Sequence, residues 1–315
     1  MTACNSIKCF GWGIAFALVF STVSARETLP ASSPDRSVLK IDGAIIDVTF
    51  DSAPTAALRQ LLVAWITKAA KAVDIYYARY PVSRVEVHIK LYEGHGARSG
   101  HASGWNGPEI SISVGRYTTA ADLADPGEEW LMTHEMVHLA FPSVAEQHHW
   151  IEEGLATYVE PVARVRAGEL TAPRIWGDML NGMPQGLPQA GDRGLDHTAT
   201  WGRTYWGGAL FCLLADIEIR ERTNNRKGLE DALRGILDAG GSIETEGELT
   251  QILDTADAAI GVSVMRPLYD RMKATPVPVD LADLWRQLGV EKHGDEILLR
   301  DDAPLAAIRK AITQR

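Results

Sequence analysis

The chain has 315 residues, of which 46% are apolar and 23% are charged, and its formal net charge is −10. A chain of this length and apolar content can bury one sizeable core, or form two lobes that share a cleft. Because the charge is acidic and no basic run stands out, we expect no nucleic acid as a partner.

The first 25 residues differ in character from the rest of the chain. Lys8 is their only charge, an apolar or small run extends from Phe10 to Val23, and small residues end the segment at Ala25. This order is typical of a secretory signal peptide over 1–25. The apolar run is shorter than the ~20 residues of a membrane-spanning helix, so we expect no membrane anchor after cleavage. The sequence therefore predicts an exported protein, periplasmic or extracellular.

Residues 26–40 are rich in Ser, Pro and charge, so we expect a flexible N-terminus of the mature chain there. Three stretches after it have the patterns of strands, and one long stretch has the spacing of a helix that Pro81 ends. The predicted strands are 44–50, 84–91 and 110–114, the predicted helix is 53–80, and a Gly-rich loop is predicted over 93–108. We therefore expect residues 41–126 to form a lobe that contains a sheet.

From about residue 128 onward, the apolar spacing is nearly all helical. The predicted helices are 128–140, 149–160, 203–222, 228–239, 247–259, 263–274 and 280–288, with a loose Gly/Pro-rich segment at 167–200 and a strand-like run at 296–300. Residues 127–315 are therefore expected to form a helical lobe. Strands first and helices after predict an α+β fold, in which a small sheet lobe packs on a mainly helical lobe.

The run His134-Glu135-Met136-Val137-His138 has the H-E-x-x-H pattern. Residues four apart lie on one face of a helix, so both imidazoles can bind one metal ion. Glu135 is one step round the helix and can reach a water molecule on the metal without binding the metal. Two neutral imidazoles leave zinc positively charged, which favours ionisation of that water.

A metal site that activates water needs three protein ligands and one open position. The next predicted helix offers a carboxylate at Glu152 or at Glu153, which directly precedes Gly154. His148 and His149 lie between the H-E-x-x-H motif and Glu153, and each is an alternative third ligand.

The H-E-x-x-H helix followed by W-x-x-E-G at 150–154 resembles the gluzincin metallopeptidases, such as thermolysin-like enzymes, aminopeptidase N and glycyl aminopeptidase. In that pattern the Glu directly before Gly binds zinc, and it corresponds to Glu153. The resemblance implies a thermolysin-like zincin fold, one zinc ion per chain in a cleft between the lobes, and Glu135 as the general base. It covers roughly residues 84–290 and is strong only at the two motif helices. The gap between His138 and Glu153 is shorter than in aminopeptidase N.

A further point of resemblance is the run Thr204-Tyr205-Trp206-Gly207-Gly208, which contains Tyr205. Aminopeptidase N-like enzymes carry Y-x-K-G at this place, and their Tyr hydroxyl stabilises the oxyanion of the tetrahedral intermediate. Tyr205 and Gly208 match that pattern, whereas Gly207 replaces the Lys. A phenol suits the role because it donates one hydrogen bond to developing negative charge. His197 is the alternative donor.

The resemblance implies a peptide or protein as the substrate. Peptides bind many such enzymes by adding a strand to a sheet edge, and we expect residues 104–107 and 110–114 to supply that edge. The G-A-M-E-N segment by which aminopeptidase N grips a free amine is absent, and Glu109 is only the nearest carboxylate by position. Exopeptidase and endopeptidase activity therefore both remain open. The segment 167–200 is a candidate lid.

Two other functions are compatible with these motifs. One is a catalytically silent zincin-fold protein that binds peptides, and the other is a zinc hydrolase of a non-peptide amide or ester. The intact H-E-x-x-H and Glu153 favour an active peptidase over a silent relative. The sequence does not indicate an oligomeric state.

The signal-peptide prediction can be tested on protein exported by its native host. Cleavage after Ala25 makes Arg26 the first residue, so N-terminal sequencing should read from Arg26. Mature protein that still begins at Met1 would contradict the prediction.

Overall fold

The structure is a computed structural model of the chain, and it describes residues 36–314. The predicted signal peptide (1–25) and most of the predicted flexible N-terminus (26–35) lie outside the described residues. Among the helices of the described residues, none has the length and apolarity that crossing a membrane requires.

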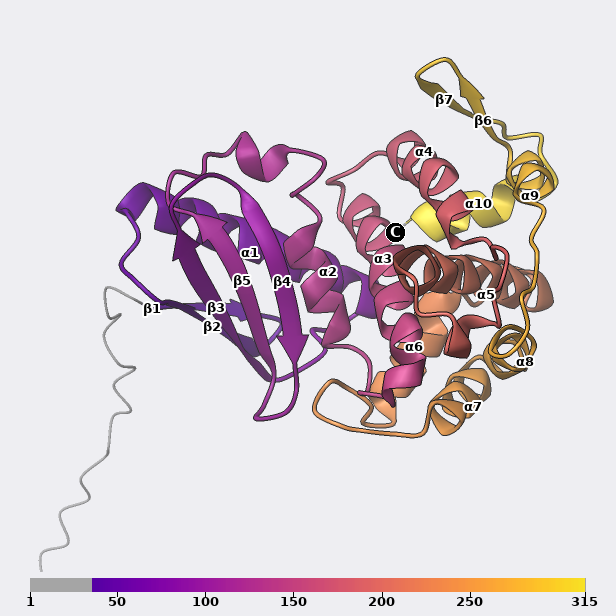
Figure 1. Cartoon of the computed structure of the whole chain (residues 1–315), viewed down its shortest axis with the longest axis horizontal. Coiled ribbons are helices and arrows are strands. Elements are labelled where there is room, and N and C mark those ends of the chain that lie inside the picture. Colours follow the sequence, from indigo (N-terminus) through magenta and orange to yellow (C-terminus); the bar gives the residue numbers. More distant parts are fainter. Residues whose placement is uncertain (1–35, 315) are drawn as a thin grey trace, which may run out of the picture. The chain divides into compact units, whose positions relative to one another are not determined.

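The N-terminal part of the described chain is built on a five-stranded sheet (Figure 1). Its strands are β1 (Arg36–Ile41), β2 (Ala44–Phe50), β3 (Arg84–Tyr92), β4 (Ala97–Ser103) and β5 (Glu109–Gly115). Their order is β1-β2-β3-β5-β4, in which β2, β3 and β5 are parallel and the two outer strands are antiparallel to their neighbours. The strand at the edge next to the helices is therefore β4.

The strands predicted at 44–50, 84–91 and 110–114 are present as β2, β3 and β5, and two expectations were wrong. Residues 36–40, expected to be flexible, form most of β1, because Asp42 and Gly43 both have positive φ and fold β1 back on β2. The expected loop over 93–108 contains β4. The side chains of β4 are mostly small or polar, so it lacks the apolar alternation of a strand and depends on pairing with β5.

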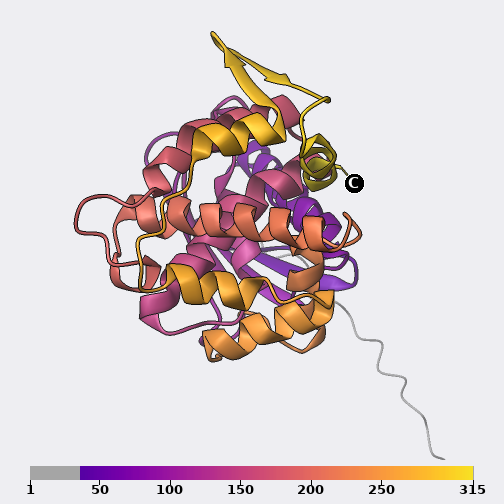
Figure 2. The same ribbon diagram turned by 90° about the vertical axis from the view of Figure 1, so that its right-hand side faces the viewer.

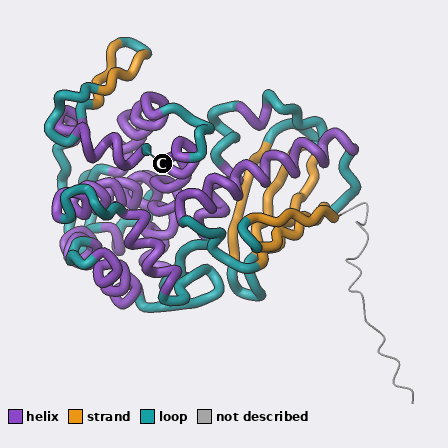
Figure 3. Tube along the Cα trace, turned by 180° about the vertical axis from the view of Figure 1, so that it is seen from behind, coloured by secondary structure: helices purple, strands orange, loops and turns teal. Residues whose placement is uncertain are grey.

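One face of the sheet is covered by α1 (Ala56–Tyr77), which Figure 3 shows running across the strands. Alternate apolar residues of β2, β3 and β5 are fully buried, as the period of two requires for a sheet with one covered face. They include Ile46, Val48, Val87, Ile89, Ile110 and Ile112. The helix ends at Ala78 in the left-handed conformation, before the position of Pro81.

The rest of the described chain is helical except for one hairpin. The helices are α2 (Leu131–His138), α3 (His149–Arg166), α4 (Ala172–Gly182), α5 (Gly208–Arg222), α6 (Leu229–Asp238), α7 (Leu249–Ile260), α8 (Met265–Met272), α9 (Leu281–Leu288) and α10 (Ala306–Thr313). The hairpin of β6 (Val290–His293) and β7 (Glu296–Leu299) projects beyond the helices in Figure 2. With ten helices and one five-stranded sheet in residues 36–314, the fold is mixed α/β.

The loose segment predicted at 167–200 is only partly correct, because it contains α4. Pro173 and Gly177 mark this stretch as a loop in the sequence, yet Pro173 lies in the first turn of the helix, where it needs no N–H partner. Ile175, Trp176 and Met179 form its buried face. The amphipathic pattern is therefore real, but it is short and interrupted by residues that usually break helices.

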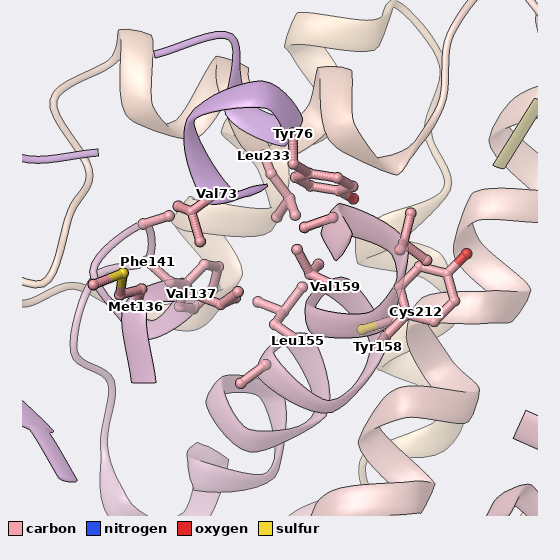
Figure 4. Close-up of a cluster of buried hydrophobic side chains, with 14 of the residues drawn as sticks. Val73, Tyr76, Met136, Val137, Phe141, Leu155, Tyr158, Val159, Cys212 and Leu233 are labelled. Carbon is pink, nitrogen blue, oxygen red and sulfur yellow. The ribbon is translucent and has the colours of Figure 1, made fainter. Parts of the chain in front are cut away.

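The core of the helical part lies around α3, where residues of α1, α2, α5 and α6 meet it (Figure 4). The lone cysteine of the described residues, Cys212, is buried here as an apolar side chain. Two glycines bring α3 and α5 together, since a Cβ on Gly154 would lie 2.3 Å from the Cα of Gly208. No other residue type permits so close an approach of two helix backbones.

The close contact at Gly154 predicts that replacing this glycine by alanine destabilises the protein, the reverse of the usual effect inside a helix. Gly→Ala inside a helix normally stabilises it, but Gly154→Ala must push α3 from α5 and should lower the free energy of unfolding by about 1–3 kcal/mol. Urea denaturation measures this change. The matched control is Gly177→Ala in α4, whose added Cβ meets only the movable side chain of Ile297 and should be tolerated. Equal stability of the two variants would contradict the packing described.

Candidate metal centre

The H-E-x-x-H helix, α2, is short and is held at both ends. In the turn before it, the Glu128 carboxylate accepts a hydrogen bond from the Ala97 amide of β4 (2.8 Å), and Glu129 accepts one from Arg164 of α3 (2.7 Å). After it, the Leu139 carbonyl accepts a hydrogen bond from the Ile243 amide (3.2 Å). These contacts fix α2 relative to β4 on one side and α3 on the other.

His134, His138 and Glu153 converge where α2 crosses α3. One ligand atom from each lies within 4.8 Å of the other two. The Nε2 atoms of His134 and His138 lie 3.1 Å and 3.8 Å from Oε2 of Glu153. Within residues 36–314, no other three His, Cys, Asp or Glu side chains form such a group. The structure thus brings together the three residues that the sequence predicts as ligands.

The chemistry of this donor set fits zinc. Burial, and then the nearby charge of His134, lowers the pKa of His138 to about 3, so its imidazole is neutral and can offer a lone pair. Burial acts to raise the pKa of Glu153, but hydrogen bonds to His134 and His149 outweigh it and hold that pKa well below its usual range. Neutral imidazoles with one carboxylate are a common ligand set of catalytic zinc.

Glu135 is buried beside this group and faces the edge strand. A Cβ on Gly100 would lie 2.4 Å from Oε1 of Glu135, so the glycine lets β4 approach the carboxylate closely. Burial, and then the charge of Glu153, raises the pKa of Glu135 to about 8, against the effect of the Ala102 amide, which donates to it. A bound cation would shift this pKa in the opposite direction. Glu135 is outside the converging group, as expected of a base rather than a ligand.

The alternative ligands His148 and His149 are not part of the converging group. The Nδ1 of His148 is 3.0 Å from Asp196, which holds its ring away from the converging group. His149 lies beside Glu153, with its Nε2 3.3 Å from Oε1 of that carboxylate. Hydrogen bonds to Glu152 and then Glu153 raise the pKa of His149 to about 10, so it is a cation rather than a ligand. His149 thereby fixes Oε1 of Glu153, the carboxylate oxygen that faces away from His134.

This role of His149 was not predicted from the sequence, although a signal for it is present. His149 and Glu153 are four residues apart on one helix, where side chains of opposite charge commonly meet.

Tyr205 lies over the same group. Its ring stacks on that of His134 with a centroid distance of 6.3 Å, and Trp201 stacks on it at 5.7 Å. Burial, and then the charges of Glu153 and Glu135, raises the pKa of Tyr205 to about 12. The phenol is therefore protonated near neutral pH and able to donate. His197, the alternative donor, is exposed and does not line the cavity at this site.

A cavity of about 800 Å³ opens over these residues. Its walls are the edge strand β4 with Gly104 and Trp105, residues of α2 and α3, Tyr205, and the segment 243–246. The expected substrate edge is therefore misassigned in part, because 110–114 forms β5 inside the sheet and β4 is the edge. Neither Glu109 nor any residue of the predicted lid, 167–200, lines this cavity.

No family model and no curated protein matches the chain. Among solved structures, it is similar to an aminopeptidase N family protein from Idiomarina loihiensis, with a TM-score of 0.59 and 14% identity over 81% of this chain and 49% of that one. It also matches a variant of an M1 zinc metallopeptidase from Deinococcus radiodurans, at a TM-score of 0.48 and 14% identity over 78% and 53% of the two chains, too weakly to support an argument.

The chain spans about half the length of the structures that it matches. The first likeness shows that the chain is folded like this aminopeptidase N family structure, in agreement with the resemblance seen at the two motif helices.

The metal centre can be tested by elemental analysis of purified protein. We expect about one zinc per wild-type chain and none in His138→Ala, because two ligands hold zinc far less tightly than three. The matched control is His149→Gln, which should keep the metal with about tenfold to a hundredfold weaker affinity. Full zinc in His138→Ala, or none in His149→Gln, would show that the ligands are misassigned.

Proposed function

We propose that the chain is a zinc-dependent peptidase in which His134, His138 and Glu153 hold the metal and Glu135 is the general base. One observation carries this proposal: two imidazoles and a carboxylate converge within 4.8 Å in a cavity that also contains a buried Glu, on an aminopeptidase-type fold. Zinc bound there would supply a Lewis acid that polarises the scissile carbonyl and acidifies a water molecule.

Glu135 is suited to move the proton of the reaction. Its carboxylate lies in the cavity, one residue from His134, yet is not among the ligands. It accepts the proton of the attacking water and then gives it to the leaving amine. Glu135 is only 5% exposed and β4 packs against its carboxylate, which limits the access of bulk water to that proton.

Tyr205 is suited to stabilise the negative charge that develops on the carbonyl oxygen. Its hydroxyl is protonated, and its ring stacks on that of His134, with both residues lining the cavity. A donor fixed before the reaction begins stabilises the transition state more than the substrate.

The edge strand β4 supports a peptide as the substrate. It lines the cavity along most of its length and has a partner, β5, on only one side. An extended peptide can add to this edge through main-chain hydrogen bonds, which places a peptide bond beside Glu135. The cavity between the sheet and the helices is then the zinc cleft expected from the sequence. We also propose that the mature enzyme acts outside the cytoplasm, as the predicted signal peptide implies.

Two substitutions separate chemistry from metal binding. Glu135→Gln keeps the shape of the side chain but cannot accept a proton, so kcat should fall by at least ~10² with zinc retained. Tyr205→Phe removes one donor to the oxyanion, so kcat should fall by ~10²–10³ with KM nearly unchanged. A peptide library first identifies peptides that the wild type cleaves in a chelator-sensitive reaction. The kcat and KM of both variants are then measured on these peptides.

The matched controls are Glu109→Gln and Tyr117→Phe, which lie outside the cavity and should stay within about twofold of wild-type kcat. An active, zinc-loaded Glu135→Gln would refute the proposed mechanism. Unchanged kcat in Tyr205→Phe would show that a donor other than Tyr205 stabilises the oxyanion.

A further inference from the structure

The turn that carries Tyr205 has an unusual backbone. Residues Arg203–Gly207 form a π-helical turn directly before α5. Such turns are rare and are frequently found at functional sites. A π-helical turn therefore needs contacts from outside the helix to keep its geometry, and those contacts decide where Tyr205 points.

One set of contacts comes from the short helical segment Met183–Gly186, which packs on the turn backbone to backbone. A Cβ on Gly186 would lie 2.4 Å from the carbonyl carbon of Trp206, and a Cβ on Gly202 would lie 2.3 Å from the carbonyl oxygen of Gln185. The two glycines thus allow the segment to press directly against the turn. This packing sets how close the segment and the turn lie.

The second contact is a buried ion pair. Nε of Arg203 lies 2.7 Å from Oδ2 of Asp192, and the two side chains are only 3% and 1% exposed. Nη1 of the same guanidinium donates to the Gly186 carbonyl, and Oδ1 of Asp192 accepts from the Gly194 amide (2.7 Å). Neither charged residue lines the cavity. The planar guanidinium thus links the first residue of the turn to the end of the Met183–Gly186 segment and to the loop that holds Asp192.

We propose that Arg203 and Asp192 are positioning residues that hold the π-helical turn in the rotation that directs the Tyr205 hydroxyl into the cavity. This inference rests on the proposed function. Because burying two charges costs desolvation energy, a buried ion pair adds little to the free energy of folding. The main effect of this pair is therefore to fix the geometry of the turn. A guanidinium presents its donors in a rigid fork, which a single ammonium cannot copy. Misplacement of a catalytic group by ~1 Å costs on the order of a hundredfold in rate.

The test uses the full-length mature protein and removes both charges together. Arg203→Met with Asp192→Asn leaves no unpaired buried charge, and the Asn oxygen can still accept from the Gly194 amide. We expect kcat to fall on the order of tenfold to a hundredfold, with KM and zinc content unchanged. Added to Tyr205→Phe, the same double change should lower kcat by less than about twofold further, because both act through one hydroxyl.

A second variant keeps the inference testable if the Arg203→Met/Asp192→Asn variant does not fold. Arg203→Lys keeps the charge but cannot reach both Asp192 and the Gly186 carbonyl, so it should give a smaller loss in kcat than the double change. The control is Arg309→Met with Asp301→Asn, which removes a buried guanidinium of α10 that also binds carbonyl oxygens at the end of α9, although its Asp301 partner is exposed. This control should keep wild-type kcat even where it lowers the melting temperature.

Hydrogen exchange of the metal-free proteins provides a readout that does not depend on catalysis. The Arg203→Met/Asp192→Asn variant should exchange faster in the peptide covering 201–208, with α2 unchanged. Wild-type kcat in this variant, a full multiplicative loss in the Tyr205→Phe background, or unchanged exchange at 201–208 would each overturn the inference. If the wild type cleaves no peptide, the proposed function fails, and faster exchange confined to 201–208 still supports the positioning role.

Discussion

The carboxylate of Glu153 is the group on which the arrangement of the site depends. A buried carboxylate is stable only with close partners, and here its two oxygens have different ones. Oε2 faces His134 and His138 on α2, whereas Oε1 faces His149 on its own helix. The carboxylate therefore fixes the rotation of α3 relative to α2 and directs one oxygen toward both imidazoles.

The position of Glu153 is set in turn by the next residue along the chain. Gly154 contacts Gly208 backbone to backbone, so α3 and α5 cross as closely as two helices can. Because Tyr205 lies in the turn that opens α5, the same crossing places the phenol over the group formed by His134 and Glu153. One close helix contact thus relates the metal ligand to the oxyanion donor.

The local parts of the site could be predicted because their signals are local. The spacing of His134 and His138 on one helix needs no tertiary information, whereas the choice of Glu153 among the candidate third ligands came from the resemblance of the Glu-Gly pair to the gluzincin pattern. Strands β2, β3 and β5 followed from their apolar residues. The role of Tyr205, by contrast, came from a family resemblance, since no local pattern separates a catalytic phenol from a packed one.

The parts that were missed depend on contacts between distant segments. β4 carries small and polar side chains and becomes a strand only through pairing with β5, yet it is the edge that lines the cavity. The turn at Arg203–Gly207 reads as an ordinary helix start, because the ion pair that holds it joins Arg203 to Asp192, eleven positions earlier in the chain. His148 and His149 are adjacent in sequence but point to different partners, which only the orientation of α3 decides.

The central claim is that the side chains of His134, His138 and Glu153 hold zinc beside the buried base Glu135. The most direct measurement is anomalous X-ray diffraction from crystals of the purified mature protein, collected on both sides of the zinc absorption edge. The account predicts one strong anomalous peak within ~2.0–2.2 Å of Nε2 of His134, Nε2 of His138 and an oxygen of Glu153, with Glu135 nearby but not bound. A peak at other residues, or well-ordered zinc-soaked crystals without a peak at these three, would contradict it.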